Sequence, residues 1–210
     1  MMLVLATAWL PLCAMAQTVS VVALGDSLTA GYGLLQKDGF VPQLQSWLVA
    51  RGEQVKVLNA GVSGDTTAGG LARLRWTLTP DVDGVIVALG GNDLLRGIDP
   101  AAARKNLSGI LEITAERGLP VLLVGMKAPG NYGADYKAEF DAIYPELAAQ
   151  YGTLYFENFL GVVVDRTTPG VVVRQHMQAD NIHPNATGVL EIVTAIGPSV
   201  VKLLRLAQQD

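Results

Sequence analysis

Two hydrophobic patterns alternate along most of the chain. Short continuous apolar runs are separated by longer stretches in which apolar residues recur every three or four positions. A continuous run is typical of a strand that is covered on both faces, whereas the longer spacing is typical of an amphipathic helix. The predicted strands are Val19–Leu24, Gln54–Leu58, Gly84–Leu89, Pro120–Val124 and, more weakly, Thr153–Phe156.

Helical spacing fills the intervals between these runs and the region after the last one. The predicted helices span residues 40–51, 66–76, 100–117, 135–150 and 185–206. Strands that alternate with helices indicate an α/β fold with a mainly parallel sheet. The chain contains no internal repeat and no linker-like tract, so residues 17–210 are predicted to form a single domain.

Residues 1–16 differ from the rest of the chain. Met1 to Leu12 is almost entirely apolar, and Ala14 and Ala16 supply small residues where signal peptidase cleaves, which predicts a signal peptide that ends before Gln17. The segment lacks the basic residues of a usual export signal, and a buried N-terminal strand or helix is the alternative. It is shorter than the roughly 20 apolar residues of a membrane span. Export predicts a periplasmic or secreted protein.

Composition excludes several classes of protein. Half of the residues are hydrophobic and 16% are charged, which is typical of a globular chain and not of a disordered one. The net charge is −4 and basic residues are scattered, so no nucleic-acid-binding surface is predicted. Cys13, the one cysteine, lies within the predicted signal peptide. Its removal would exclude a thiol nucleophile, a disulfide framework and cysteine-bound zinc.

Chemically capable side chains follow three of the predicted strands and precede the last helix. Asp26 and Ser27 follow the first strand, Gly64 lies in the loop after the second, and Asn92 follows the third. The fourth group is Asp180-Asn181-Ile182-His183, just before the final helix. Because ligands bind at the carboxyl ends of the strands in doubly wound sheets, these groups are expected to converge.

Each group has a use in acyl transfer. Ser27 at a tight strand-to-helix turn exposes a hydroxyl, His183 can take its proton, and Asp180 can hold the other imidazole nitrogen. The N–H groups of Ser27 and Gly64 and the amide of Asn92 can bind a tetrahedral oxyanion. The prediction is therefore a catalytic triad of Ser27, Asp180 and His183 with an oxyanion hole. The other histidine of the chain lacks a matching acidic partner and is interpreted as a surface or packing residue.

Nearby acidic residues are given structural interpretations. Asp26 is expected to stabilise its own turn through nearby backbone groups, and Asp93 to cap the short turn after the third strand. Asp65 and Thr66 are rival candidates for the N-cap of the second predicted helix.

The four groups together resemble the SGNH hydrolase superfamily, which is named after a Ser, a Gly, an Asn and a His. These match Ser27, Gly64, Asn92 and His183, and the resemblance runs from about residue 19 to 204. The stretches ALGDSLTAGYGL, NAGVSGDTTAGGLARL, VALGGNDLLRG and DNIHPNATG are similar to the bacterial periplasmic group of acyl-CoA thioesterase I, lysophospholipase and arylesterase.

The resemblance implies a three-layer α/β/α sandwich that needs no metal or cofactor. It implies hydrolysis of small-molecule acyl esters and thioesters, including aryl esters and lysophospholipids, by a monomer through a Ser27 acyl-enzyme. In that group the loop after the fourth strand lines the acyl site, which places Met126, Pro129 and Tyr132 at the substrate. An equally weighted alternative is that Met126 and Tyr132, with Leu160 and the valines at 162–164, are core residues.

Two other functions remain as alternatives. A carbohydrate O-acetyl esterase could use the same scaffold, but Trp47 and Trp76, the two tryptophans after residue 16, both fall on predicted helices and do not suggest a sugar-stacking platform. A non-catalytic acyl-lipid-binding protein would not need nucleophile, base, acid and oxyanion donors together. A serine esterase is therefore the leading hypothesis.

Overall fold

A parallel β-sheet forms the centre of the molecule. The computed structural model describes residues 18–164 and 175–209, so the predicted signal peptide lies outside the described residues. The described residues form a five-stranded sheet in the order β2-β1-β3-β4-β5, and every neighbouring pair is parallel. The strands are β1 (Val19–Gly25), β2 (Val55–Gly61), β3 (Gly84–Ala88), β4 (Val121–Val124) and β5 (Leu154–Phe156). The predicted α/β class is confirmed.

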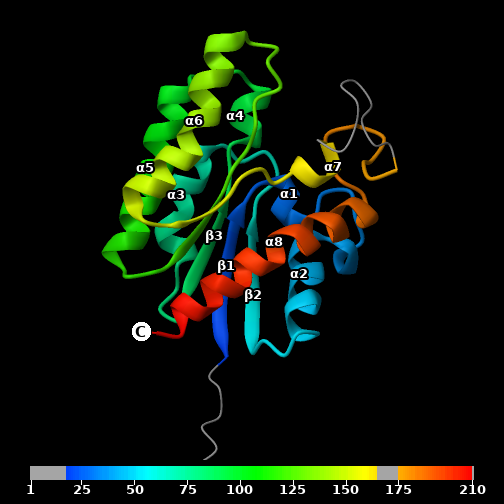
Figure 1. Ribbon diagram of the computed structural model, residues 1–210, viewed down its shortest axis with the longest axis vertical. Helices are drawn as coiled ribbons and strands as arrows, with labels where there is room; N and C mark the ends of the chain where they lie inside the picture. The colour runs from blue at the N-terminus through cyan, green and yellow to red at the C-terminus, as the bar shows by residue number, and fades with distance from the viewer. Residues whose placement is uncertain (1–17, 165–174, 210) are drawn as a thin grey trace, which may run out of the picture.

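Helices cover both faces of this sheet (Figure 1). One face carries α2 (Phe40–Val49) and α8 (Ala186–Ala207). The other face carries α3 (Thr67–Thr77), α5 (Pro100–Glu116) and α6 (Ala134–Tyr151). The three-layer α/β/α sandwich is thus confirmed, and each long helix lies within two residues of its predicted ends.

The hydrophobic pattern explains this layering. All five residues of β3 are buried, as expected for a strand with helices on both faces. On α8 a single stripe faces the sheet, and a fully buried aliphatic side chain contributes about 1.5–3 kcal/mol. The stripe consists of Val189, Ile192, Val193, Ile196, Val200 and Leu203.

Four short helices were not predicted. They are α1 (Ser27–Ala30), the 3₁₀ helix η1 (Gln36–Asp38), α4 (Gly91–Leu95) and α7 (Gly161–Val164). Each is too short to show a helical period in the sequence. Two of them carry predicted site residues, because α1 begins with Ser27 and α4 contains Asn92.

Polar side chains decide where α3 begins. Thr66 is its N-cap and accepts a hydrogen bond from the Gly69 N–H, whereas the rival Asp65 pairs with Arg73 at 2.6 Å. Asp93 does not cap its own turn, contrary to the prediction. Its buried carboxylate accepts from the Thr67 N–H at 2.8 Å and the Thr67 hydroxyl at 2.6 Å, so that it ties α4 to α3.

The order of the strands creates the site. β1 lies between β2 and β3, so the chain leaves β1 toward one side and later returns on the other. Gly25 at the end of β1 is paired with Gly61 of β2 and Ala88 of β3, which makes the three strand ends level. A reversal of strand order of this kind opens a crevice at the carboxyl edge of the sheet.

Candidate active site

A tight turn presents Ser27. Asp26 alone separates the serine from the end of β1, and the Asp26 carboxylate accepts a hydrogen bond from the Leu28 N–H at 3.0 Å. A side chain on Gly25 would overlap the Thr29 side chain, so the turn requires glycine at that position. Gly31 ends the helix in the left-handed region at φ 85°. The turn therefore leaves the Ser27 hydroxyl half-buried at the edge of the crevice.

His183 and Asp180 complete a chain of hydrogen bonds to Ser27. The His183 Nε2 lies 2.9 Å from the Ser27 Oγ, and its Nδ1 lies 2.7 Å from the Asp180 Oδ2. The second carboxylate oxygen of Asp180 accepts the N–H groups of Ile182 and His183, each at 3.0 Å. The side-chain bond to His183, followed by these backbone bonds, lowers the pKa of Asp180 to about 2. Asp180 is therefore an anion across the physiological range.

A short hairpin carries this histidine. Met177 and Pro184 form an isolated antiparallel bridge, and Asn181 turns the chain between them at φ 56°. Asn185 then caps α8 by accepting the Gly188 N–H. The ring of Tyr32 packs on the imidazole of His183, with 4.6 Å between ring centroids. His183 is thus held from two sides.

Asn92 reaches the same place from α4. Gly90 caps this helix at φ 120°, and a side chain at position 90 would overlap the Tyr144 hydroxyl. The Asn92 Nδ2 donates to the Asp26 Oδ2 at 3.3 Å. This hydrogen bond uses one N–H of the amide and leaves the second N–H for a ligand. Gly64 has φ 85°, and its carbonyl accepts from the Arg96 Nη2 at 2.8 Å.

Asp26 has a further contact that the sequence analysis missed. The predicted bond to nearby backbone is present, but the bond to Asn92 joins residues 66 positions apart. Asp26 is 1% exposed, and burial raises its pKa from 3.8 to about 6, although its hydrogen bonds to Leu28 and Asn92 act in the opposite direction. No local sequence signal predicts this pairing, because it depends on β1 and β3 being neighbours.

A mainly apolar cavity of about 470 Å³ opens beside Ser27, Asn92 and His183. Met126 and Pro129 line it, as predicted from the resemblance, whereas Tyr132 is not among its lining residues. The Tyr132 ring packs against Tyr136 instead, and its hydroxyl contacts the Leu95 carbonyl at 3.3 Å. Gly64 does not line the cavity either. Apolar walls come from Leu28, Leu94, Leu95, Met126, Pro129, Leu160, Val164, Met177 and Ile182.

Two charged residues of α6 hold one wall of this cavity. The Asp141 carboxylate accepts the Ala128 N–H at 2.8 Å, and the Lys137 Nζ donates to the Ala128 carbonyl at 2.7 Å. Lys137 and Asp141 also pair with each other at 2.7 Å. The backbone N–H and carbonyl of Ala128 are therefore both held by the i,i+4 ion pair of Lys137 and Asp141.

Comparison with known proteins gives the arrangement a family. The model of the GDSL-like lipase/acylhydrolase family matches residues 23–189, which include every residue of the predicted triad and of the predicted oxyanion hole. The chain belongs to this family. It is therefore a carboxylic ester hydrolase of the GDSL type, in agreement with relatives that are named as an esterase, an arylesterase and a thioesterase.

Three relatives illustrate the similarity of this GDSL hydrolase. Esterase TesA of Pseudomonas aeruginosa is 40% identical, with 91% of each chain covered. Thioesterase 1/protease 1/lysophospholipase L1 of Escherichia coli is 36% identical, with 79% of this chain and 76% of the relative covered. The crystal structure of AlinE4, an SGNH-hydrolase family esterase, is 47% identical and superposes with a TM-score of 0.74, covering 91% of this chain and 99% of AlinE4.

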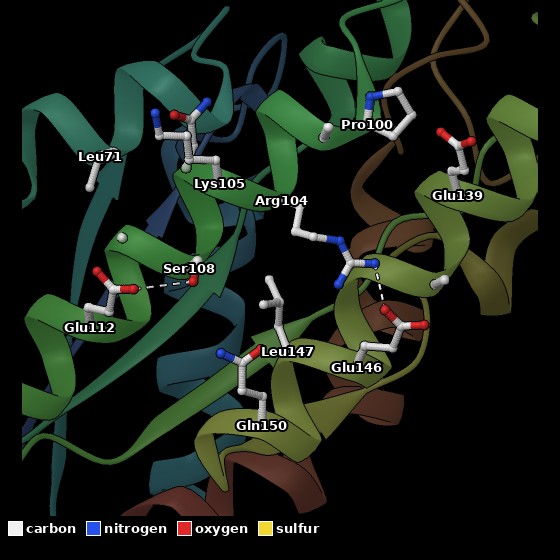
Figure 2. Close-up of a pocket in the computed structure, with 14 residues that line it drawn as sticks. Leu71, Pro100, Arg104, Lys105, Ser108, Glu112, Glu139, Glu146, Leu147 and Gln150 are labelled. Carbon is white, nitrogen blue, oxygen red and sulfur yellow. Dashed lines mark hydrogen bonds and ion pairs between the residues drawn. The ribbon is translucent and has the colours of Figure 1, made fainter.

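A larger hollow, of about 790 Å³, lies elsewhere on the GDSL hydrolase, along α5 and α6 with Leu71 of α3 at its edge (Figure 2). Arg104 reaches across it from α5 and pairs with Glu146 of α6 at 2.6 Å. Its walls mix both signs of charge and include no histidine. Of these two hollows, the smaller one beside Ser27 contains a nucleophile and a base and is therefore the candidate active site.

Proposed function

We propose that the enzyme hydrolyses acyl esters and thioesters through an acyl-enzyme on Ser27. The observation that carries this proposal is the unbroken chain Ser27 Oγ, His183 and Asp180, with separations of 2.9 and 2.7 Å. A nucleophile within reach of a base, and a base oriented by an acid, is the arrangement that activates a serine. The names of the relatives, an esterase and a thioesterase/lysophospholipase, support the same chemistry.

The reaction proceeds in two displacements. Ser27 attacks the acyl carbonyl while His183 takes the hydroxyl proton, and the anion of Asp180 stabilises the imidazolium. The N–H groups of Ser27 and Gly64 and the amide of Asn92 bind the oxyanion, and each such donor contributes roughly 10²–10³ in rate. His183 then protonates the departing alcohol or thiol. Water, activated by the same histidine, releases the acid.

The cavity supports an acyl chain longer than acetyl. A volume of about 470 Å³ with aliphatic and methionine walls exceeds what an acetyl group occupies. These walls match the acyl part of aryl esters, acyl-CoA thioesters and lysophospholipids. Neither Trp47 nor Trp76 lines the cavity, so its described lining offers no aromatic platform that would favour the alternative carbohydrate O-acetyl esterase.

A serine-directed fluorophosphonate probe tests this proposal. Wild type is expected to be labelled, and Ser27→Ala is expected to lose both labelling and ester hydrolysis. Ser46→Ala, which changes an exposed serine of α2, is the matched control and should behave as wild type. Labelling or hydrolysis that survives Ser27→Ala would refute the proposal. Nitrophenyl acetate and octanoate, octanoyl-CoA and a lysophosphatidylcholine then rank acyl length and leaving group.

The proposal includes export of a monomer to the periplasm or medium. Residues 1–16 would act as the signal peptide, and the exported protein would begin at Gln17. Among the described residues, no helix has the length and apolar character needed to cross a membrane. Mass determination of the exported protein tests the cleavage site, and retention of residues 1–16 would refute it.

A further inference from the structure

The side chain of Gln178 joins the two halves of the active site. Its Nε2 donates to the Tyr32 carbonyl at 2.8 Å and to the Pro184 carbonyl at 3.0 Å. Tyr32 follows the nucleophile turn, whereas Pro184 follows His183 directly in the chain. One amide group therefore bridges two segments that are far apart in the sequence. Gln178 and Tyr32 are 146 positions apart.

Both ends of the bridge lead to reacting groups through the backbone. On one side the Tyr32 N–H donates to the Ser27 carbonyl at 3.1 Å. On the other side the Gln178 N–H donates to the His183 carbonyl at 2.8 Å. The hydrogen bonds of Gln178 thus close a ring that contains Ser27, Tyr32 and His183.

The local backbone makes room for this amide. Gly33 has φ 74°, a conformation that strains any other residue, and a side chain there would overlap the Gln178 Oε1. The ring of the neighbouring Tyr32 packs at a tilt of 39° against the imidazole of His183. Gly33 therefore lets Gln178 enter at the point where the nucleophile segment meets the histidine.

Asp180 cannot do the work of this bridge. Asp180 and His183 belong to one hairpin, so their bond orients the imidazole within that hairpin alone. The Ser27 to His183 bond joins residues 156 positions apart, and its length depends on how the two segments are docked. A misplacement of about 1 Å can cost about 10²-fold in rate.

We propose that Gln178 is a positioning residue that sets the distance between the Ser27 hydroxyl and the His183 imidazole. This inference rests on the proposed function, because it assumes that these two groups react. It assigns Gln178 no contact with substrate. Its effect is exerted through the backbone of Tyr32 and of Pro184.

Gln43 provides a matched comparison. Its Nε2 also bridges two carbonyls, those of Asp38 at 2.8 Å and Ala186 at 3.0 Å. These acceptors lie at the end of η1 and the start of α8, beyond the catalytic hairpin. Removing this amide breaks the same kind of bond without releasing Tyr32 or Pro184.

The test compares Gln178→Met with Gln43→Met, since methionine keeps the length of the side chain and removes the donor. Gln178→Met is expected to lower kcat and the rate of fluorophosphonate labelling together, by about 10- to 100-fold, with KM within twofold. The acidic midpoint of kcat/KM should stay at the wild-type pH, because the bond between Asp180 and His183 is retained. Gln43→Met should lose similar thermal stability but keep kcat within twofold.

A second variant approaches the same contact from the other segment. Gly33→Ala displaces the Gln178 amide without altering it and should also lower kcat. Because both substitutions break one contact, the double variant should lose no more than the worse single variant. If Gln178→Met folds poorly, the single variant Gly33→Ala keeps the inference testable, because it leaves Gln178 itself unchanged.

Several results would overturn the inference. These are a wild-type kcat in Gln178→Met, equal kcat losses in the two glutamine variants, a shifted pH midpoint, or multiplied losses in the double variant. Failure of the proposed function has a different signature, since Ser27→Ala would then remain active or wild type would hydrolyse no ester. The two failures are therefore distinguishable.

Discussion

Asp26→Asn is expected to make the protein more stable at neutral pH and less active. Asparagine keeps the shape of the side chain, and its carbonyl oxygen can still accept the Leu28 N–H. The Asp26 Oδ2, which now accepts from the Asn92 Nδ2 at 3.3 Å, becomes an amide nitrogen that faces another donor. Asn92 then loses the acceptor that directs it.

The stability gain follows from the buried charge. Burial raises the pKa of Asp26 from 3.8 to about 6. Between these values the folded state keeps a proton that the unfolded state releases, so the free energy of unfolding falls as pH rises. Above pH 6 this penalty reaches about 3 kcal/mol, since one pKa unit corresponds to about 1.36 kcal/mol. Subtracting about 1 kcal/mol for the opposed donors leaves Asp26→Asn about 1–2 kcal/mol more stable at pH 7.

Urea unfolding of both proteins from pH 3.5 to 7.5 provides the measurement. The difference in unfolding free energy, variant minus wild type, should rise by about 3 kcal/mol across this range. Over the same series kcat of Asp26→Asn should be about 10- to 100-fold below wild type, less than complete loss of an oxyanion donor. Asp135→Asn, at an exposed position on α6, is the control and should keep full activity. A difference that does not change with pH would refute the reasoning.

Two further predictions concern the oxyanion hole and the acyl wall. Gly64→Ala should cost about 1 kcal/mol of stability, because the φ of Gly64 is 85°, and it should also lower kcat. Gly52→Ala is the control. Gly52 has a φ of 83° and no atom near the position of a side chain, so this variant should lose similar stability but keep kcat. Equal kcat in the two glycine variants, measured with nitrophenyl octanoate, would contradict this role for Gly64. Lys137→Met releases the Ala128 carbonyl and should lower kcat/KM for octanoate about 3- to 10-fold relative to acetate, an effect of about 1 kcal/mol for a lost hydrogen bond. Lys105→Met on α5 is its control, and an unchanged octanoate-to-acetate ratio in Lys137→Met would count against the wall.

Much of the fold follows from local patterns in the sequence. Apolar runs predicted all five strands of the described sheet. The reason is clearest for β1, β3 and β4, which lie inside the sheet between two helical layers and are buried almost throughout. Helical spacing predicted the five long helices to within two residues at each end. The N-cap of α3 was narrowed to Asp65 or Thr66, since an N-cap acts on backbone within three residues of itself, and the structure has Thr66.

The candidate triad was also predictable, for a different reason. Ser27, Gly64 and Asn92 each follow a strand, and parallel strands bring their carboxyl ends to one edge of the sheet. Asp180 and His183 are separated by three residues and form their bond within one hairpin. Placement of these groups therefore required no more than the α/β class and the order of the motifs.

Contacts between distant segments were decided by the tertiary structure alone. The bond of Asp26 to Asn92 and that of Asp93 to Thr67 required β1 to lie between β2 and β3, which no local pattern specifies. Tyr132 was expected at the substrate, but its ring packs on Tyr136 because the loop after β4 turns into α6 there. Gln178 has no motif of its own. Its role depends on where two remote carbonyls meet, whereas hydrophobic period and capping act over a few residues of one segment.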